Sequence, residues 1–365
     1  MFEGIIKKNL KQCFFLLFFS SSAIALAEEP SVPVSEKKFN AGELIMHHIG
    51  DAHDWHILDI GEHPVSLPLP VIIYSSERGL DIFLSSSFHH GEKTYKGYKL
   101  EHNHIVAVNE TGEMEAAEAK TNEELTASLW DFSITKNVFA LFFSIALILW
   151  IFLSAAKKYK TNPGEAPRGL QSAIEPLIVF VRDDIAKSAI GKHKYEKFMP
   201  FLLTVFFFIL INNLLGLIPI IPGGANLTGN IAVTLTLAII TFLITTFIGN
   251  KHYWRHVFAM PGVPMAVLII LTPIEILGVF LKPFVLMIRL FANITAGHII
   301  ALSFFSLIFI FGEMHPAAGL GASVLSIAFT VFMGLLELLV AFLQAYVFTL
   351  LSAMYFGMAT EEAHH

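Results

Sequence analysis

Long apolar runs fill the second half of this chain, whereas shorter apolar and polar stretches alternate in the first half. Residues 137–155, 200–218 and 231–248 each carry almost no charge and are long enough to cross a bilayer as a helix, which takes about 20 residues. Residues 265–311 would form ~70 Å of helix, more than twice the ~30 Å hydrocarbon core. This run predicts either two spans that fold back near Lys282 or one long, strongly tilted helix.

The last apolar run, residues 324–358, leaves the same two alternatives open. Residues 312–323, between the two long runs, are predicted to be a turn. Residues 156–199 form a loop rich in Lys and Arg, which the positive-inside rule assigns to the cytoplasm. Within this loop apolar residues recur at helical spacing and predict an amphipathic helix, at Leu170, Ile174, Leu177, Ile178, Val181 and Ile185.

The N-terminal half has the pattern of a small soluble unit. Three runs, Val65–Tyr74, Leu80–Ser85 and Tyr95–Val108, favour β-strands and are broken by Pro, Gly and Asn. They predict a small antiparallel β unit. The acidic, Ala-rich stretch Glu110–Leu125 predicts a helical or loose linker to the membrane part.

The first 27 residues read as a secretory signal peptide. Lysines precede a short apolar core that contains Cys13, the single cysteine, and Ala25-Leu26-Ala27 is typical of a cleavage site. We therefore expect a signal peptide at 1–27, a periplasmic His-rich acidic domain at 28–136 and a membrane domain at 137–365. The chain would lie in the inner membrane of a bacterium, with its C-terminus in the cytoplasm.

Composition agrees with a polytopic membrane protein that carries a soluble part. Of the 365 residues, 55% are hydrophobic, and the mean hydropathy is +0.64. The pI near 6.2 gives no indication of nucleic-acid binding. An intramembrane metalloprotease is not expected, because the chain has no H-E-x-x-H motif.

Most of the 16 histidines fall in the expected periplasmic domain. His48, Asp51, His53 and His56 are spaced so that they could supply ligands to zinc, although the spacing matches no strong zinc signature. The alternative is a group of surface histidines without a function. A periplasmic metal sensor tethered by the membrane part is a further alternative, but it would leave Arg289 unexplained.

Arg289 lies in an apolar run, where an arginine at mid-bilayer costs roughly 3 kcal/mol or more. At ~100° per residue, Glu275, Lys282 and Arg289 fall on nearly one stripe of a helix. Asn293 lies within ~40° of that stripe, and His298 points to the opposite side. The stripe would face a partner outside this chain.

The last apolar run supplies two further polar residues. If the two long runs form an antiparallel hairpin, equal depth places Gln344 level with Arg289, and Glu337 nearly level with His298. His and Glu can carry protons once their surroundings tune them, whereas Arg stays charged. This arrangement suggests proton conduction through two half-paths that Arg289 keeps apart. The alternative for His298 and Glu337 is a satisfied buried pair with a structural role.

These residues resemble the a subunit of the rotary F-type ATP synthases. The resemblance covers about residues 130–362 and rests on Arg289-Leu290-Phe291-Ala292-Asn293 with Ala296-Gly297-His298, on Glu337 with Leu343-Gln344-Ala345-Tyr346, and on Asn213-Leu214-Leu215-Gly216. It implies an all-α polytopic membrane fold with five transmembrane helices, the last two long and tilted along a ring of c subunits. The cytoplasmic amphipathic helix and the small β-containing periplasmic domain add to that fold.

The resemblance also implies a mechanism and partners. Arg289 would face the ring carboxylate and block leakage between half-channels. The periplasmic half-channel would be lined by Asn293, His298, Glu337 and Gln344, and Glu275 would sit at the cytoplasmic one. The c ring, the b-subunit peripheral stalk and the rest of the complex would be the protein partners, with no cofactor and no catalytic chemistry of the chain's own.

Two departures from the family pattern stand out. Many members carry the carboxylate on the first long helix and the histidine on the last, whereas here His298 and Glu337 are exchanged. The domain at 28–136 lies outside the pattern, so the resemblance gives it no role. A proton-coupled secondary transporter is the alternative function, but the chain shows no inverted repeat between its halves.

Overall fold

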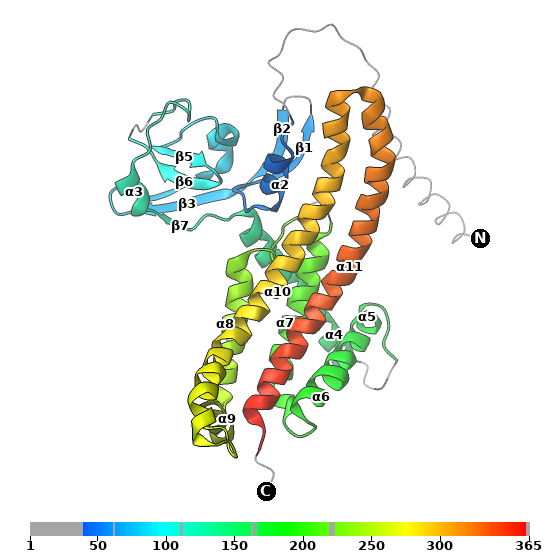
Figure 1. The fold of residues 1–365 in the computed structure, drawn as a ribbon. Coiled ribbons are helices and arrows are strands. Elements are labelled where there is room, and N and C mark those ends of the chain that lie inside the picture. Colours follow the sequence, from blue (N-terminus) through cyan, green and yellow to red (C-terminus); the bar gives the residue numbers. More distant parts are fainter. Residues whose placement is uncertain are drawn as a thin grey trace, which may run out of the picture. The chain divides into compact units, whose positions relative to one another are not determined.

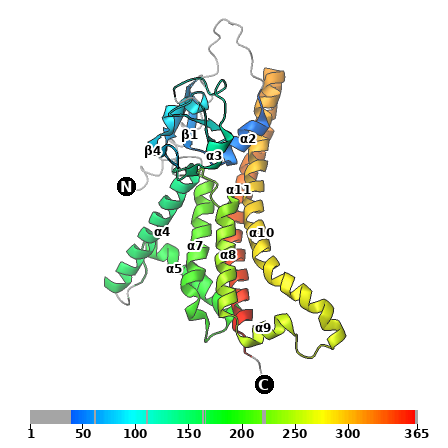
Figure 2. The same ribbon diagram turned by 90° about the vertical axis from the view of Figure 1, so that its left-hand side faces the viewer.

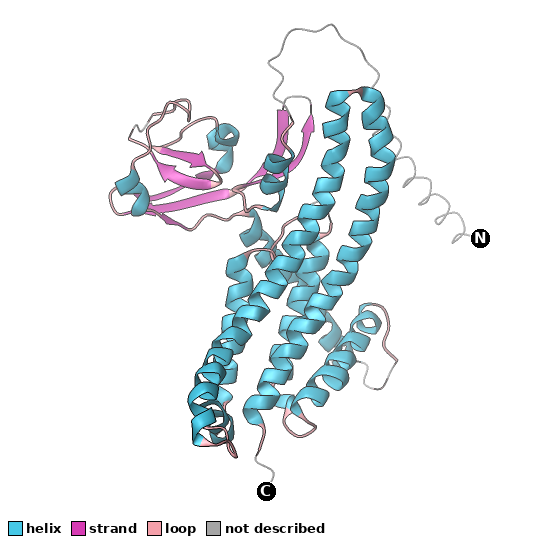
Figure 3. Ribbon diagram, viewed as in Figure 1, coloured by secondary structure: helices cyan, strands magenta, loops and turns pink. Residues whose placement is uncertain are grey.

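The computed structural model describes residues 39–60, 63–109, 112–161, 164, 166–218 and 223–362. The expected signal peptide and Cys13 lie outside these residues. The described part is mostly helical and has a small β region near its start (Figures 1 and 3). Its helices are α2 Ala41–Ile49, η1 Ser85–Gly91, α3 Glu123–Ala127, α4 Lys136–Thr161, α5 Leu170–Phe180, η2 Val181–Ala186, α6 Lys187–Ile190, η3 Tyr195–Lys197, α7 Met199–Gly216, α8 Ile231–Ile248, α9 Lys251–Phe258, α10 Met265–Met314 and α11 Pro316–Thr360.

Five of the described helices, α4, α7, α8, α10 and α11, are long and apolar enough to cross a membrane (Figures 1 and 2). The predicted polytopic membrane fold with five spans is confirmed to this extent. Both open alternatives are also decided, because each long run forms a single helix, α10 of 50 residues and α11 of 45 residues. At 1.5 Å per residue, α10 is ~75 Å long and must tilt strongly to remain in a bilayer.

The connection between the two long helices lies within 312–323, as predicted, but the predicted length is wrong, because His315 alone separates α10 from α11. The His315 side chain caps α11 by accepting a hydrogen bond from the Ala317 amide at 3.1 Å. Pro316 suits the first turn of α11, where no backbone donor is needed. Gly319 then packs directly on Gly312, since a Cβ on Gly319 would lie 2.7 Å from the Gly312 Cα. The small residues that suggested a loop instead allow two helices to touch.

Helix α7 occupies the centre of the largest core, against α11 and the segment α5–η2–α6. Its sequence is apolar on all sides, as expected for a helix surrounded by others. Leu202, Phe206 and Ile209 are fully buried, and Phe348 and Phe356 of α11 join them. Three of the apolar residues predicted to form an amphipathic helix, Ile174, Val181 and Ile185, are buried in the segment α5–η2–α6, whose amphipathic character stays a prediction. Its position at the cytoplasmic membrane surface stays a prediction.

The β region contains three small antiparallel sheets among the described residues. Their strands are β1 Asp54–Ile60 with β2 His63–Pro68, then β3 Pro70–Ser75 between β4 Gly79–Leu84 and β7 Trp130–Asp131, and finally β5 Tyr98–Glu101 with β6 His104–Ala107. The predicted β unit is confirmed, although the sequence analysis missed α2, β1 and β7. Val71, Ile73, Phe88 and Tyr98 form its buried core.

The stretch Glu110–Leu125 is not a helical or loose linker in the part that the structure describes. Apart from the start of α3, it forms turns that pair with the β region, through bridges from Glu115 to Lys93 and from Thr121 to Val108. The Thr94 hydroxyl adds a hydrogen bond to the Gly112 carbonyl at 2.9 Å. Backbone pairing therefore overrides the helical tendency of the alanines.

Candidate proton path in the long helix hairpin

Arg289 lies on an exposed side of α10. Among the described residues it makes no hydrogen bond and no ion pair. The Arg289 charge interacts electrostatically with the Tyr355 side chain of α11. An arginine in an apolar helix is costly unless a partner or a water-filled cavity compensates its charge. Asn293, one turn further along α10, is exposed as well.

His298 and Glu337 meet across the hairpin, as the depth relation predicts. The Nδ1 atom of His298 lies 3.9 Å from the Oε1 atom of Glu337, and both side chains are 14% exposed. That Glu337 oxygen is buried without a hydrogen-bond partner in the described protein. The pair is therefore in contact but not saturated, which leaves room for a proton donor or acceptor such as water.

A cleft beside this pair is lined by Asn213, Leu217, Asn293, Ile294, His298, Glu337, Val340 and Ala341. Asn213 is held in place by two hydrogen bonds, since its Nδ2 donates to the Ala341 carbonyl at 3.1 Å and its Oδ1 accepts from Thr228 at 2.5 Å. Gly297 creates the space for the carboxylate, because a Cβ there would lie 2.7 Å from Glu337 Oε1.

Gln344 is buried, only 3% exposed, on the same helix as Glu337. Seven residues separate the two, so they share one face of α11. Gln344 does not line the cleft that holds Asn293 and His298. The structure therefore brings Asn293, His298 and Glu337 together and leaves Gln344 further along the helix.

A second cleft lies between α8, α9, α10 and α11, lined by Thr241, Phe242, Thr245, Thr246, Tyr253, Val279, Lys282, Pro283 and Tyr355. Lys282 is half-buried there, with its Nζ 5.7 Å from the centroid of the Tyr355 ring. The expectation that Lys282 faces outward beside Arg289 is wrong, because α8 and α11 cover its side of α10. The charge of Glu275 acts on Lys282 and on Tyr253 of α9. Burial raises the pKa of Tyr253, and the nearby Glu275 raises it further.

Two residues act electrostatically on His298, an effect that the sequence analysis did not predict for either of them. They are His48 of α2 and Lys136, the first residue of α4. Lys136 is 7% exposed, and its Nζ donates to the His48 carbonyl at 3.1 Å. Helix α2 packs on α10. No spacing rule connects residues 48, 136 and 298, so only the folded chain reveals this contact between the N-terminal region and the cleft.

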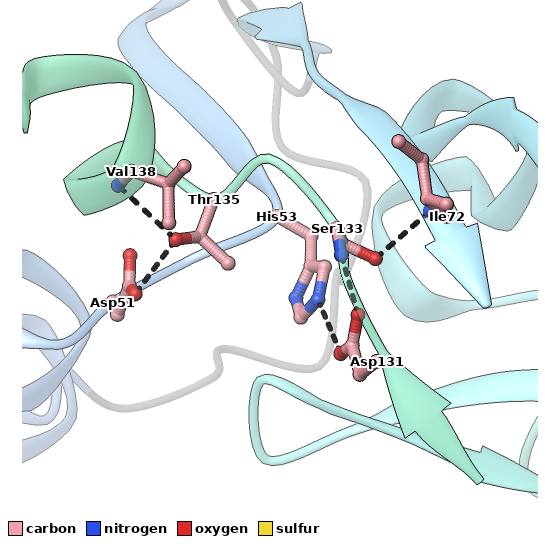
Figure 4. A network of polar contacts seen from close by, with 7 residues as sticks. All are labelled: Asp51, His53, Ile72, Asp131, Ser133, Thr135 and Val138. Carbon is pink, nitrogen blue, oxygen red and sulfur yellow. Dashed lines mark hydrogen bonds and ion pairs between the residues drawn. The ribbon is translucent and has the colours of Figure 1, made fainter. Parts of the chain in front are cut away.

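The predicted metal ligands are directed to different partners (Figure 4). Asp51 accepts hydrogen bonds from the Thr135 hydroxyl at 2.8 Å and the Asn137 amide at 3.0 Å, and so caps α4. His53 lies 3.3 Å from Asp131, with its Nε2 toward a carboxylate oxygen. The side chain of His56 lies outside the description. Among the described residues no three His, Cys, Asp or Glu side chains are placed to hold one metal ion.

Asp131 links the sheet to this network. Its burial would raise the pKa of the carboxyl, but hydrogen bonds from His53 and Ser133 outweigh burial and hold the pKa below its ordinary value of 3.8. Asp131 is therefore held as a carboxylate. Its two hydrogen-bond partners come from the loop before β1 and from the loop between β7 and α4.

Comparison with known proteins identifies the family. The family model described as the ATP synthase A chain matches residues 138–357, more than half of the chain. The chain belongs to the ATP synthase A chain family. This membership confirms the resemblance to F-type ATP synthase a subunits and does not favour a proton-coupled secondary transporter. A second model, described only as a domain of unknown function, matches residues 44–132.

Several relatives of the A chain are closely similar. The chain is 52% identical over 237 residues to "ATP synthase subunit a 2" of Chlorobaculum tepidum, a match that covers 63% of this chain and 64% of that protein. It is 48% identical over 242 residues to "ATP synthase subunit a 2" of Prosthecochloris aestuarii, covering 65% and 71%. For "ATP synthase subunit a" of Myxococcus xanthus the identity is 43% over 241 residues, covering 64% and 75%.

Proposed function

We propose that this chain is the proton-translocating stator subunit of an F-type ATP synthase in a bacterial inner membrane. Two offset half-channels deliver protons to and from a carboxylate on a ring of c subunits, and Arg289 separates them. Ring rotation then couples proton flow to ATP synthesis, and the chain carries out no catalytic step of its own. The b-subunit peripheral stalk and the rest of the complex hold it against the ring.

The observation that carries this proposal is the exposed, unpaired Arg289 on an apolar helix. A guanidinium remains charged at any working pH, so it attracts a deprotonated ring carboxylate and cannot relay a proton itself. A proton that arrives on one side of Arg289 must therefore leave with the ring and complete a rotation. The missing carboxylate belongs to the c ring, since the described residues offer Arg289 no ion-pair partner.

The periplasmic half-channel in this proposal passes through Asn293, His298 and Glu337, with Gln344 beyond them. The cleft beside the His298–Glu337 pair supports this path. The cytoplasmic half-channel begins near Glu275 and uses the cleft beside Lys282 and Tyr355. The N-terminus would be periplasmic, following a signal peptide over 1–27, and the C-terminus cytoplasmic.

The test uses the complex reconstituted into vesicles with an imposed proton gradient. We expect Arg289→Ala to abolish ATP synthesis, while the chain still copurifies with the c ring. Arg255→Ala, which removes an exposed arginine on α9 that lines neither cleft, is the matched control and should retain synthesis. Synthesis at the normal rate by the Arg289→Ala complex would overturn the proposed mechanism.

A further inference from the structure

The sheet β4–β3–β7 carries apolar side chains on both of its faces. On the inner face, Val71 and Ile73 are buried in the core of the β region. On the other face Ile72 is partly exposed, and six apolar side chains are exposed, Leu80 at 61%, Ile82 at 60%, Leu84 at 48%, Tyr74 at 48%, Trp130 at 63% and Phe132 at 60%. An antiparallel sheet that faces water normally presents polar residues on that side.

Strand register gathers these side chains into one patch. Tyr74 pairs with Leu80 on one side and with Trp130 on the other, and Ile72 pairs with Ile82. Phe132 donates its amide to the Ile72 carbonyl at 2.8 Å. Its ring stacks on Trp130 with the centroids 6.4 Å apart. We call this patch the outer face, made of Ile72, Tyr74, Leu80, Ile82, Leu84, Trp130 and Phe132.

The polar residue of β4 points to the inside instead. Asp81 lies among its apolar neighbours in sequence, and its carboxylate accepts from Lys96 at 2.9 Å and from Tyr98 at 3.2 Å. The strand therefore places its charge against the core and its leucines and isoleucine outward. Such an inversion costs stability in water, where an exposed apolar patch of this kind marks an interaction surface.

The outer face is continuous with the membrane-spanning part of the chain. Phe132 precedes the first residue of α4, Lys136, by four residues, which span at most ~14 Å when extended. The polar headgroup layer is ~5–7 Å thick on each side of a bilayer. Phe132 and Trp130 are thus tethered within reach of the lipid surface at which α4 begins.

We propose that the outer face rests on the lipid bilayer, in the leaflet where α4 enters. Trp and Tyr rings favour the membrane interface, and leucine and isoleucine side chains insert at the boundary of the acyl chains. The strand positions that form the outer face hold no charged residue that would have to be desolvated. Exposed apolar residues are also present on α4, at Phe142 and Ile145.

Lipid contact gives the N-terminal region a mechanical role beyond proton translocation. A sheet that rests on the bilayer fixes the orientation of the segment that carries Lys136 and α2. That segment contacts α10 and lies within electrostatic reach of His298. Anchoring the sheet would hold this contact in place beside the cleft.

Spin labelling of the full chain in phosphatidylcholine–phosphatidylglycerol vesicles tests the proposal. Cys13→Ser removes the single cysteine, and Ile82→Cys then carries the label on the outer face. Glu118→Cys, at an exposed position of the turn before α3, is the matched control. We expect the label at 82 to collide with oxygen dissolved in lipid and to lose collisions with a water-soluble nickel chelate, whereas the label at 118 collides freely with the chelate.

Two results would overturn the proposal. Equal access of the nickel chelate to labels at 82 and 118 would place the outer face in water. Protection of the label at 82 from both reagents would mean that protein covers the face. A Leu80→Glu substitution, with the label at Leu84→Cys, should restore chelate access on the same strand without changing the core. These measurements need no ATP synthesis, so they can fail or succeed independently of the proposed function.

Discussion

Gly297→Ala tests whether the geometry of the His298–Glu337 contact controls proton flow. The new Cβ would lie 2.7 Å from Glu337 Oε1, whereas ordinary contacts begin at 3.4 Å, so the carboxylate must retreat by about 0.7 Å. The contact between His298 Nδ1 and Glu337 Oε1 is already 3.9 Å long. The two atoms already lie beyond the range of direct proton transfer, about 2.6–3.2 Å, so the shift changes where the carboxylate stands relative to a water that links the pair.

A misplacement of about 1 Å can cost a proton-transfer site on the order of 100-fold, so a shift of this size should slow proton flux on the order of tenfold. A less stable helix would not explain such a loss of proton flux, because alanine is more favourable than glycine in the middle of a helix by about 1 kcal/mol. The assay is the rate of proton uptake into vesicles that contain the reconstituted complex.

Gly334→Ala is the matched control for this prediction. It makes the same chemical change on α11, and its Cβ would meet no atom within 4 Å. Flux through this control should equal that of the unmodified chain. If Gly297→Ala also conducts at the normal rate in an assembled complex, the position of Glu337 relative to His298 is not part of the proton path.

Three further outcomes follow from the contacts in the structure. Glu337→Gln, which keeps the shape but removes the exchangeable charge, should slow proton flux in the same vesicles; unchanged flux would give the residue a structural role only. Gly319→Val should lower the thermal unfolding temperature of the full chain, because the side chain collides with backbone of the facing helix and overpacking costs about 1–3 kcal/mol, whereas Gly321→Val meets open space and should change little. The pKa of Asp131 is lowered in the folded chain, so its contribution to stability is present above about pH 4 and is lost as the pH falls through the folded pKa. Protection of the strand amides from hydrogen exchange should decline over that pH range, and Asp131→Asn should make the decline smaller. An unchanged decline in Asp131→Asn would mean that the contact with His53 contributes nothing to stability.

Most of the membrane architecture could be predicted from the sequence alone, because a helix that crosses the hydrocarbon core needs a minimum length and tolerates few charged residues. The span predicted at 231–248 coincides with α8, Ile231–Ile248. The antiparallel pairing of His298 with Glu337 was also predictable, since two helices joined by a short connection keep a fixed register. Such rules depend only on rise per residue and on the cost of burying charge.

Other features were decided by tertiary contacts. Periodicity could not show whether residues 265–311 fold back, because a proline such as Pro283 can break a helix or be accommodated within one. Lys282 was expected to face outward, but α8 and α11 cover it, and sequence spacing cannot reveal which face a neighbouring helix covers. The turn at 312–323 was predicted too long for a similar reason, since Gly319 could equally serve a loop or a close helix contact.

The sequence by itself determined that an arginine lies in an apolar run, with His298 on the opposite side of a helix from it, and that Glu337 would be nearly level with His298 if the two long runs formed a hairpin. Only the tertiary structure showed that His48 and Lys136 lie near His298, and that a sheet in the N-terminal region turns an apolar face outward. The physical reason is the range of the interactions. Helical phase and membrane depth act over neighbouring residues and can be counted, whereas contacts between residues far apart in the chain depend on how all the elements pack together.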